Sequence, residues 1–198
     1  MLFGRMLLTV AFGLLVVVFC DAVPSLFSSQ LTSNKDCGFP NGTETKFYAY
    51  NCDSTTQIQV NGADVFDNST GKPMYPVDFK KKILIKLNAF NSGGSIRDNK
   101  ADVSIDEYSY SWIHSDCRWS SIPTFGLLNN IDGCEFAHNC PLKSGKLTLQ
   151  LPLDLTKFAS IIQFIAGNKP YQLTIKMRDG DHPKKVVACV VAQLHFKS

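Results

Sequence analysis

The feature that most constrains the fold is the segment Asp132–Gly145, which carries two cysteines separated by five residues. Cys134 and Cys140 lie between an Asp-Gly turn signal and a proline, and a proline favours an extended residue before it. In an oxidising compartment this spacing predicts a small disulfide-closed loop. Leucines then fall at every second position from Leu147 to Leu153, which is the period of a strand with one apolar face. The sequence therefore predicts a disulfide loop that leads into a half-buried strand.

The N-terminus has the pattern of a secretory signal peptide. One arginine precedes an apolar run from Met6 to Cys20, and small residues follow at the positions that a signal peptidase recognises at its cleavage site. The run is shorter than the roughly 20 residues that cross a bilayer, which favours a cleaved signal over a retained anchor. We expect residues 1–22 to be removed, residues 23–35 to form a flexible leader, and residues 36–198 to form the domain.

Cysteine usage and glycosylation signals agree with export. Cleavage would leave six of the seven cysteines, and an even number in an exported chain predicts three disulfides, although the count leaves their pairing open. The sequons Asn41-Gly42-Thr43 and Asn68-Ser69-Thr70 predict N-glycosylation at Asn41 and Asn68. The net charge is only +3 and does not cluster along a helix, so we expect no nucleic-acid partner.

Most of the remaining chain predicts short strands. Runs rich in β-branched and aromatic residues, bounded by turn residues, are typical of strands. We expect strands at residues 46–52, 56–61, 79–89, 101–113, 119–125, 147–153, 173–178 and 186–196. Glycines and prolines between Asn61 and Pro76 predict a long connection. The pattern indicates an all-β fold, a two-layer antiparallel sandwich.

Two of these strands carry irregular patterns. In the strand at 101–113, apolar residues through Ile105 occupy odd positions, whereas the aromatic residues from Tyr108 to Trp112 occupy even ones. A β-bulge near Asp106 would reconcile the two faces. The strand at 119–125 contains Pro123, which a central ladder position does not tolerate, so we expect that strand at an edge.

The lysines of the strand at 79–89 have two interpretations. Lys80, Lys82 and Lys86 share the face opposite the isoleucines. They could guide the protein to acidic lipid headgroups. They could equally form a solvated face whose charges discourage edge-to-edge aggregation.

The segment Asp154–Gly167 is apolar on all sides, which no single helical stripe explains. One interpretation is a short helix or strand extension buried against the sandwich. The other is an exposed apolar lip that contacts membrane or lipid, because large exposed apolar patches mark interaction sites.

The cysteine frame resembles the ML-domain lipid-recognition family over residues 36–198. The resemblance is carried by Asp36-Cys37, by the loop from Cys134 to Gly145 with its Cys-Pro pair, and by Cys189 in the last strand. Asp132-Gly-Cys and Asn139-Cys-Pro-Leu are similar to the sterol-carrier branch. The run from Gly133 to Cys140 and Tyr171-Gln-Leu are similar to the ganglioside-activator branch, so the branch and the ligand stay open.

The resemblance implies an immunoglobulin-like sandwich whose sheets part to admit a lipid. It implies the disulfides Cys37–Cys189, Cys134–Cys140 and Cys52–Cys117. The expected function is that of a monomeric carrier of a sterol, glycolipid or acyl chain. Such a carrier would work in the secreted or endolysosomal space and would contact membranes transiently.

Strand faces give candidate residues for the wall of a lipid cavity, although periodicity does not distinguish a hollow sandwich from a filled one. The candidate wall residues are Ile83, Ile85, Leu87, Tyr108, Tyr110, Trp112, Leu149, Leu151, Leu173, Ile175 and Met177. At the mouth we place Phe125, Phe158, Ile161 and Phe164.

Other function classes receive less support. The sequence lacks a Gly-x-Ser-x-Gly elbow and a His-Glu-x-x-His metal motif, so we expect neither catalytic residues nor an enzyme. Cys134, His138 and Cys140 could bind zinc, but in an exported chain a disulfide is favoured, so no metal and no cofactor beyond a lipid ligand is expected. The alternative function is a secreted protein-recognition module with a filled core.

Overall fold

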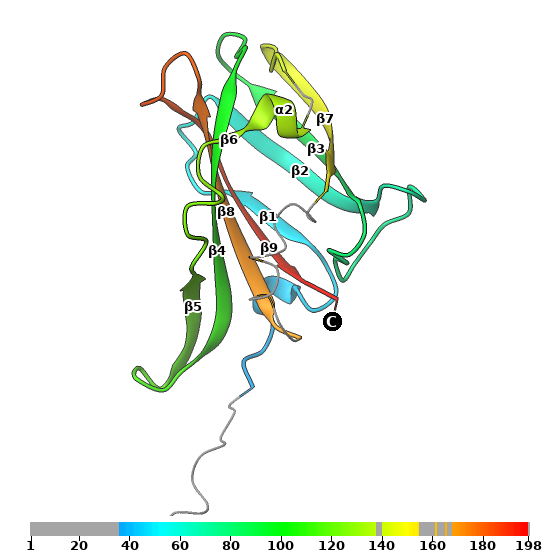
Figure 1. Ribbon diagram of the computed structural model, residues 1–198, viewed down its shortest axis with the longest axis vertical. Coiled ribbons are helices and arrows are strands. Elements are labelled where there is room, and N and C mark those ends of the chain that lie inside the picture. The colour runs from blue at the N-terminus through cyan, green and yellow to red at the C-terminus, as the bar shows by residue number, and fades with distance from the viewer. Residues whose placement is uncertain (1–35, 138–139, 155–160, 162–164, 166–167, 198) are drawn as a thin grey trace, which may run out of the picture. The chain divides into compact units, whose positions relative to one another are not determined.

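The computed structural model describes residues 36–137, 140–154, 161, 165 and 168–197. Nearly all regular structure in these residues is β-strand (Figure 1). The elements are η1 (Pro40–Gly42), β1 (Tyr48–Asn51), β2 (Ile58–Asp67), β3 (Ile83–Asn91), β4 (Asn99–Ser111), β5 (Asp116–Ile122), β6 (Ile131–Asp132), α2 (Gly133–Ala137), β7 (Gly145–Leu153), β8 (Pro170–Asp179) and β9 (Val186–His195). Among the described residues, no helix has the length and apolar character needed to cross a membrane.

The strands form two antiparallel sheets that face each other. The larger sheet has the order β1-β9-β8-β4-β5, with β6 also paired to β4, and the smaller sheet has the order β2-β3-β7. Apolar side chains of both sheets meet in two clusters, one that includes Tyr171 and Phe196 and one that includes Leu142 and Val187. The predicted all-β, two-layer antiparallel sandwich is therefore confirmed.

Strands β3 and β7 follow the predicted alternation. They pair without a break from Ile83–Leu153 to Asn91–Gly145. Because successive side chains of a strand point to opposite faces, the isoleucines and leucines at alternate positions of both strands share the inner face. The smaller sheet thus presents a continuous aliphatic surface to the larger one.

Strand β2 is longer than predicted. It runs on to Asp67 in place of the connection expected after Asn61. A bulge between Val60 and Gly62 shifts the register of β2 against β3, so the inward-facing positions change from even to odd numbers. The bulge breaks the period of two on which a strand prediction depends, and the Asn61-Gly62 pair looks like a turn. The expected connection is wrong for this reason.

Strand β4 has no bulge near Asp106, contrary to the prediction. Its pairing with β8 is continuous from Asn99–Asp179 to Glu107–Tyr171. Beyond Glu107, β4 pairs with β5 alone, so the two strands form a hairpin that extends past β8 (Figure 1). The change from odd to even apolar positions therefore needs no bulge, because the far half of β4 lies outside the two-layer region. Strand β5 lies at the sheet edge, as predicted.

The disulfide pairing corrects two of the three predicted bonds. Cys134 pairs with Cys140 as predicted, but Cys37 pairs with Cys117 and Cys52 with Cys189. Strand β1 pairs with β9, and the backbone N–H of Cys52 donates to the carbonyl of Cys189 at 2.9 Å. This register brings the two α-carbons within 5.3 Å of each other. The pairs Cys37–Cys189 and Cys52–Cys117 are therefore wrong.

An asparagine joins the two sheets along one edge of the sandwich. The side-chain amide of Asn51 in β1 donates to the carbonyl of Val60 in β2 at 2.8 Å, and its oxygen accepts from the N–H of Val60 at 2.8 Å. The side chain thereby continues a backbone ladder from the larger sheet to the smaller one. Together with Cys52–Cys189 in the next position, this contact closes the β1–β2 edge.

The segment before β1 covers the outer face of β9. The amide of Asn41 donates to Gln193 at 2.6 Å, and the ring of Phe39 lies 5.0 Å from that of His195. Gln193 and His195 are consequently buried although they face away from the other sheet. Tyr75 completes this layer, because its hydroxyl accepts from the N–H of His195 and donates to the carbonyl of Thr43.

Candidate functional site

The sandwich contains an internal cavity of about 300 Å³ between its two sheets. A volume of this size is at the lower end of the range for small-molecule sites, which runs from about 300 to 1,000 Å³. Apart from Gly133, every described residue that lines the cavity has an aliphatic or aromatic side chain. The described walls are therefore suited to contact with hydrocarbon.

Most of the predicted wall residues line this cavity. They come from β3, β7 and β8, whose alternate side chains point toward the opposite sheet. The predicted residues in the lining are Ile83, Ile85, Leu87, Leu149, Leu151, Leu173, Ile175 and Met177. That these residues contact a lipid stays a prediction.

Sequence reasoning missed much of the wall on the other strands. Strand β9 contributes alternate residues from Ala188 to Leu194, Phe196 follows directly after the strand, and β4 contributes Val103 and Ile105. The outer face of β9 is apolar from Val187 to Val191 and becomes polar only at Gln193 and His195, so alternation did not mark the inner face along the first half of the strand. The paired register with β8, where Val190 lies opposite Ile175, is the signal that identifies these residues.

Three predicted aromatic wall residues lie elsewhere. The odd positions of β4 point into the cavity, so Tyr108 and Tyr110 face the opposite side of the larger sheet. There the ring of Tyr108 contacts that of Trp119 at 5.0 Å. Trp112 follows the end of β4 and is 82% exposed. The assignment of these three residues to the wall is therefore corrected.

The predicted mouth residues also need correction where the structure describes them. Phe125 is 75% exposed and does not line the cavity; in the same connection between β5 and β6, Leu128 is buried and does line it. Ile161 is only 2% exposed and belongs to the cavity lining, so it is a wall residue. Phe158 and Phe164 lie outside the described residues, as does most of the segment 154–167.

The three lysines predicted to share one strand face do not all lie in the strand. Lys80 and Lys82 precede β3, whereas Lys86 lies within it. The ammonium of Lys86 lies 4.2 Å from the centre of the Phe66 ring, on the outer face of the smaller sheet. A cation over an aromatic face is a stabilising contact in its own right. Lys86 therefore has a structural role that the strand pattern did not predict.

The described lining of the cavity offers none of the side chains that acid–base chemistry needs. No ionisable side chain stands among the described residues of its lining. Tyr75 packs against the neighbouring apolar cluster, and burial raises its pKa to about 12. Tyr75 is therefore neutral at physiological pH. The described walls can exclude water from an apolar ligand.

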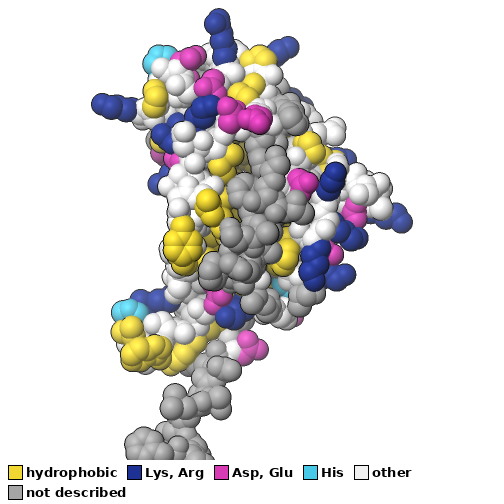
Figure 2. All heavy atoms as spheres, viewed as in Figure 1, with side chains coloured by type: hydrophobic (Ala, Val, Ile, Leu, Met, Phe, Trp, Pro, Cys, Tyr) yellow, Lys and Arg dark blue, Asp and Glu magenta, His cyan; other side chains and the backbone are white. Residues whose placement is uncertain are grey.

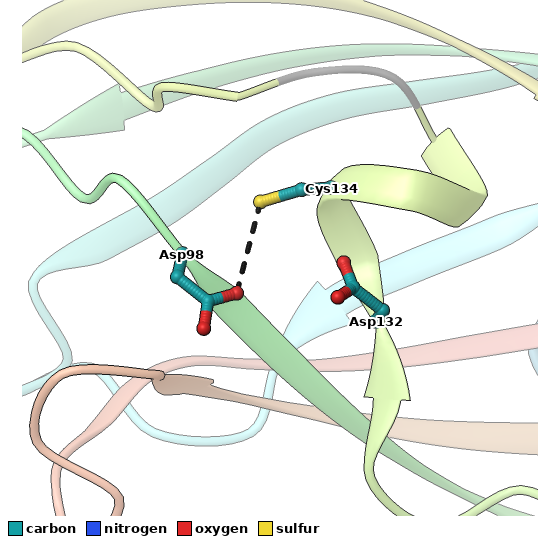
Figure 3. Close-up of side chains that lie close together, drawn as sticks. All are labelled: Asp98, Asp132 and Cys134. Carbon is teal, nitrogen blue, oxygen red and sulfur yellow. Dashed lines mark hydrogen bonds between the residues drawn. The ribbon is translucent and has the colours of Figure 1, made fainter.

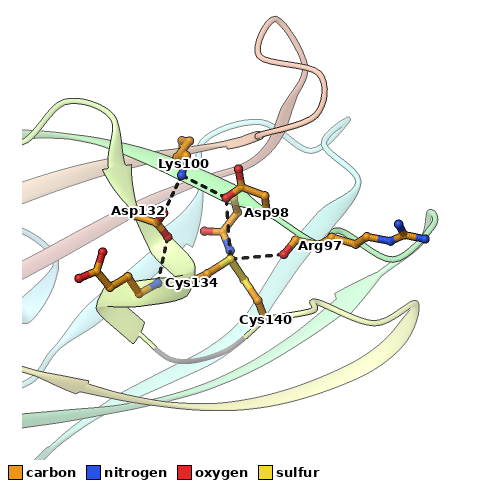
Figure 4. Close-up of a disulfide and its surroundings, with 8 residues drawn as sticks. Arg97, Asp98, Lys100, Asp132, Cys134 and Cys140 are labelled. Atoms are coloured by element: carbon orange, nitrogen blue, oxygen red, sulfur yellow. Dashed lines mark hydrogen bonds and ion pairs between the residues drawn. A yellow bond between two sulfur atoms is a disulfide. The ribbon is translucent and has the colours of Figure 1, made fainter.

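The disulfide loop lies next to a cluster of charged side chains. Asp98, Asp132 and Cys134 approach one another closely enough to resemble a metal site (Figure 3). However, the sulfur of Cys134 is bonded to Cys140 and is no thiolate. The ammonium of Lys100 lies 3.2 Å from Asp98 and 2.7 Å from Asp132, between the two carboxylates (Figure 4). Lys100 thus already supplies positive charge to both carboxylates, and these ion pairs fix the loop to β4.

The ion pair of Asp132 gives a pH-dependent prediction. A hydrogen bond from Lys100, and then one from the N–H of Glu135, hold the pKa of Asp132 below its ordinary value of 3.8. A carboxyl whose pKa is depressed on folding stabilises the fold above its unfolded pKa and loses that contribution as pH falls through its folded pKa. We expect Asp132→Asn to lower the free energy of unfolding at about pH 7 but not at about pH 2. Urea unfolding at both pH values measures this difference; an equal loss at both would contradict it.

Comparison with known proteins gives a fold likeness only. No protein-family model matches the chain. No curated protein sequence matches it either. A solved structure that resembles it is a Niemann-Pick type C2 protein from Japanese carpenter ant, with a TM-score of 0.43 and 12% identity, covering 76% of this chain and 99% of that one. Another is chicken MD-1 complexed with lipid IVa, with a TM-score of 0.37 and 13% identity, covering 78% of this chain and 92% of that one.

With identities this low and TM-scores below 0.5, neither neighbour indicates what this chain binds.

Proposed function

We propose that this chain is a lipid carrier that holds the hydrocarbon part of its ligand between the two sheets. The observation that carries the proposal is a cavity whose described lining offers no polar side chain. Each methylene transferred from water to such a site contributes about 0.8 kcal/mol, so a chain of about fifteen methylenes gains on the order of 12 kcal/mol. A soluble carrier needs a gain of this size to compete with a membrane.

The same lining defines which part of the ligand enters. A polar group buried without a hydrogen-bond partner costs roughly 2–7 kcal/mol, and the described wall supplies no side-chain partner. The headgroup of a glycolipid, the hydroxyl of a sterol or the carboxylate of a fatty acid therefore stays outside the cavity. The ligand class is thus one with a long apolar body and a polar end.

The proposal places the carrier in an oxidising compartment, secreted or endolysosomal, after removal of residues 1–22. Three disulfides are typical of exported proteins. Of the two sequon asparagines, Asn68 is exposed; Asn41 is also exposed as a residue, but its side-chain amide donates to the buried Gln193. The carrier works as a monomer and without catalysis. The cavity favours this proposal over the alternative, a protein-recognition module with a filled core.

Uptake of single-chain lipids by delipidated protein tests the proposal. We expect saturable binding in which each methylene removed from a fatty acid weakens the affinity about fourfold, at about 0.8 kcal/mol per methylene. A fatty alcohol and a fatty acid of equal length should bind within about tenfold of each other, because the headgroup stays in water. Failure to bind any member of a panel of fatty acids, sterols and glycolipids would overturn the proposal.

A further inference from the structure

The hairpin of β4 and β5 ends in an exposed apolar turn. Its four turn residues, Trp112–Ser115, are named here the hairpin tip. Trp112 is 82% exposed and Ile113 is 68% exposed, although both are large hydrophobic residues. Figure 2 shows hydrophobic side chains gathered where this hairpin ends, away from the body of the sandwich. Large apolar side chains exposed together on a projecting turn do not stabilise the fold, and exposed apolar patches often mark interaction sites.

The hairpin tip carries no acidic or basic side chain except a histidine. From Tyr108 to Ser115 the sequence has no Asp, Glu, Lys or Arg. The charges on either side are paired: Glu107 with Lys169 at 2.7 Å, and Asp116 with Arg118 at 2.9 Å. The tip can therefore leave water without removing an unpaired carboxylate or ammonium from solvent, which would be costly.

The hairpin is braced so that the tip stays extended. A two-stranded hairpin alone is marginally stable in water. Here Cys117 in β5 is bonded to Cys37, and the rings of Tyr108 and Trp119 pack against each other across the two strands. Asp116 and Arg118 form a two-point ion pair next to the turn. These contacts hold Trp112 outward on a fixed support.

We propose that the hairpin tip inserts into the interfacial layer of a lipid bilayer and holds the carrier at the membrane. The inference rests on the proposed carrier function, which requires access to membrane lipid. A convex turn suits a fluid surface, tryptophan favours the membrane interface, and isoleucine favours the acyl region below it. Because the tip lacks fixed charge, its attachment needs no anionic lipid.

The tip is separate from the cavity. Ile105 of the same strand lines the cavity, and Trp112 follows seven residues later, which is about 23 Å at about 3.3 Å per residue. Substitutions at the tip should therefore change attachment to vesicles and leave lipid affinity in solution unchanged. This separation makes the two proposals testable independently.

Flotation with phosphatidylcholine vesicles tests the tip. We expect Trp112→Ser combined with Ile113→Ser to reduce vesicle binding at least about tenfold, because it removes both inserting side chains. Phe90→Ser is the matched control, since Phe90 is 49% exposed on the outer face of β3 and should be dispensable. Wild-type binding should persist when salt is raised. Binding of the double variant equal to wild type, or loss of wild-type binding in high salt, would overturn the proposal.

Tryptophan fluorescence provides a second readout that does not depend on the double variant. The chain has two tryptophans, and Trp112 is the exposed one, whereas Trp119 is partly buried. Vesicles should shift wild-type emission to shorter wavelength, and Trp112→Phe should remove the shift while vesicle binding persists. An unchanged emission spectrum on vesicle binding would contradict insertion of the tip. Fatty-acid uptake by the same variants measures the carrier function separately. If wild-type protein took up no fatty acid, the carrier proposal would be rejected, whereas the vesicle measurements would still decide the role of the hairpin tip.

Discussion

Replacing Ile175 with tryptophan is expected to reduce lipid uptake by at least about tenfold while leaving thermal stability unchanged or raised. Ile175 lies in the middle of β8, paired with Val103 of β4 and Val190 of β9, and all three line the cavity. The larger ring would occupy space that the ligand otherwise fills. In a filled core, the same substitution would overpack the structure and cost about 1–3 kcal/mol. The two measurements together therefore distinguish a hollow sandwich from a filled one.

The control for Ile175→Trp lies one residue further along the strand. Lys176 is exposed and points to the opposite face of β8, so Lys176→Trp places the same ring outside the cavity. Titration with a fluorescent fatty acid and a thermal melt should show normal uptake for the control and lost uptake for Ile175→Trp. If Ile175→Trp bound the fatty acid as tightly as wild type, the proposed location of the ligand would be wrong.

The second large effect is expected from the disulfide between Cys52 and Cys189. These cysteines are 137 positions apart in sequence, and a crosslink restricts the unfolded chain more when it closes a longer loop. Alanine at both positions should lower the free energy of unfolding by about 3–5 kcal/mol. Cys134 and Cys140 are only 6 positions apart, and their removal should cost about 2 kcal/mol.

Urea unfolding of the two double-alanine variants measures which of the two disulfides contributes more to the free energy of unfolding. Cys52–Cys189 also lies beside the contact of Asn51 with Val60, so its removal loosens the edge at which the two sheets are joined. Loss of Cys134–Cys140 leaves that edge intact. A larger loss of stability for the short loop than for the long one would contradict this explanation of how the sandwich is held together.

Much of the fold follows from local pattern. The alternating residues of β3, β7 and β8 predicted both the strands and the side chains that line the cavity, because each strand has one inner face and one outer face. The pattern failed on the first half of β9, where the outer face from Val187 to Val191 is apolar as well. Further along β9, the N-terminal segment with Phe39 and Asn41 buries the polar outer residues Gln193 and His195, and no local period reveals a cover that comes from about 150 residues away.

The remaining errors have the same physical origin. Which cysteines pair is decided by the register of β1 on β9, and neither the number nor the spacing of cysteines contains that register. The aromatic residues from Tyr108 to Trp112 were assigned to the wall because aromatic alternation resembles a core face. They belong to a hairpin that extends beyond the second sheet, and only the pairing of β4 with β8 shows where the two-layer region ends.

Native mass spectrometry of the purified, folded chain tests the central claim most directly, because it counts bound lipids without choosing a ligand in advance. The predicted result is a single lipid per polypeptide, lost on unfolding, and replaced one for one when delipidated protein is given a long-chain fatty acid. A folded chain whose mass never exceeds that of the polypeptide and its glycans, before or after exposure to lipid, would contradict the claim that the space between the sheets holds hydrocarbon.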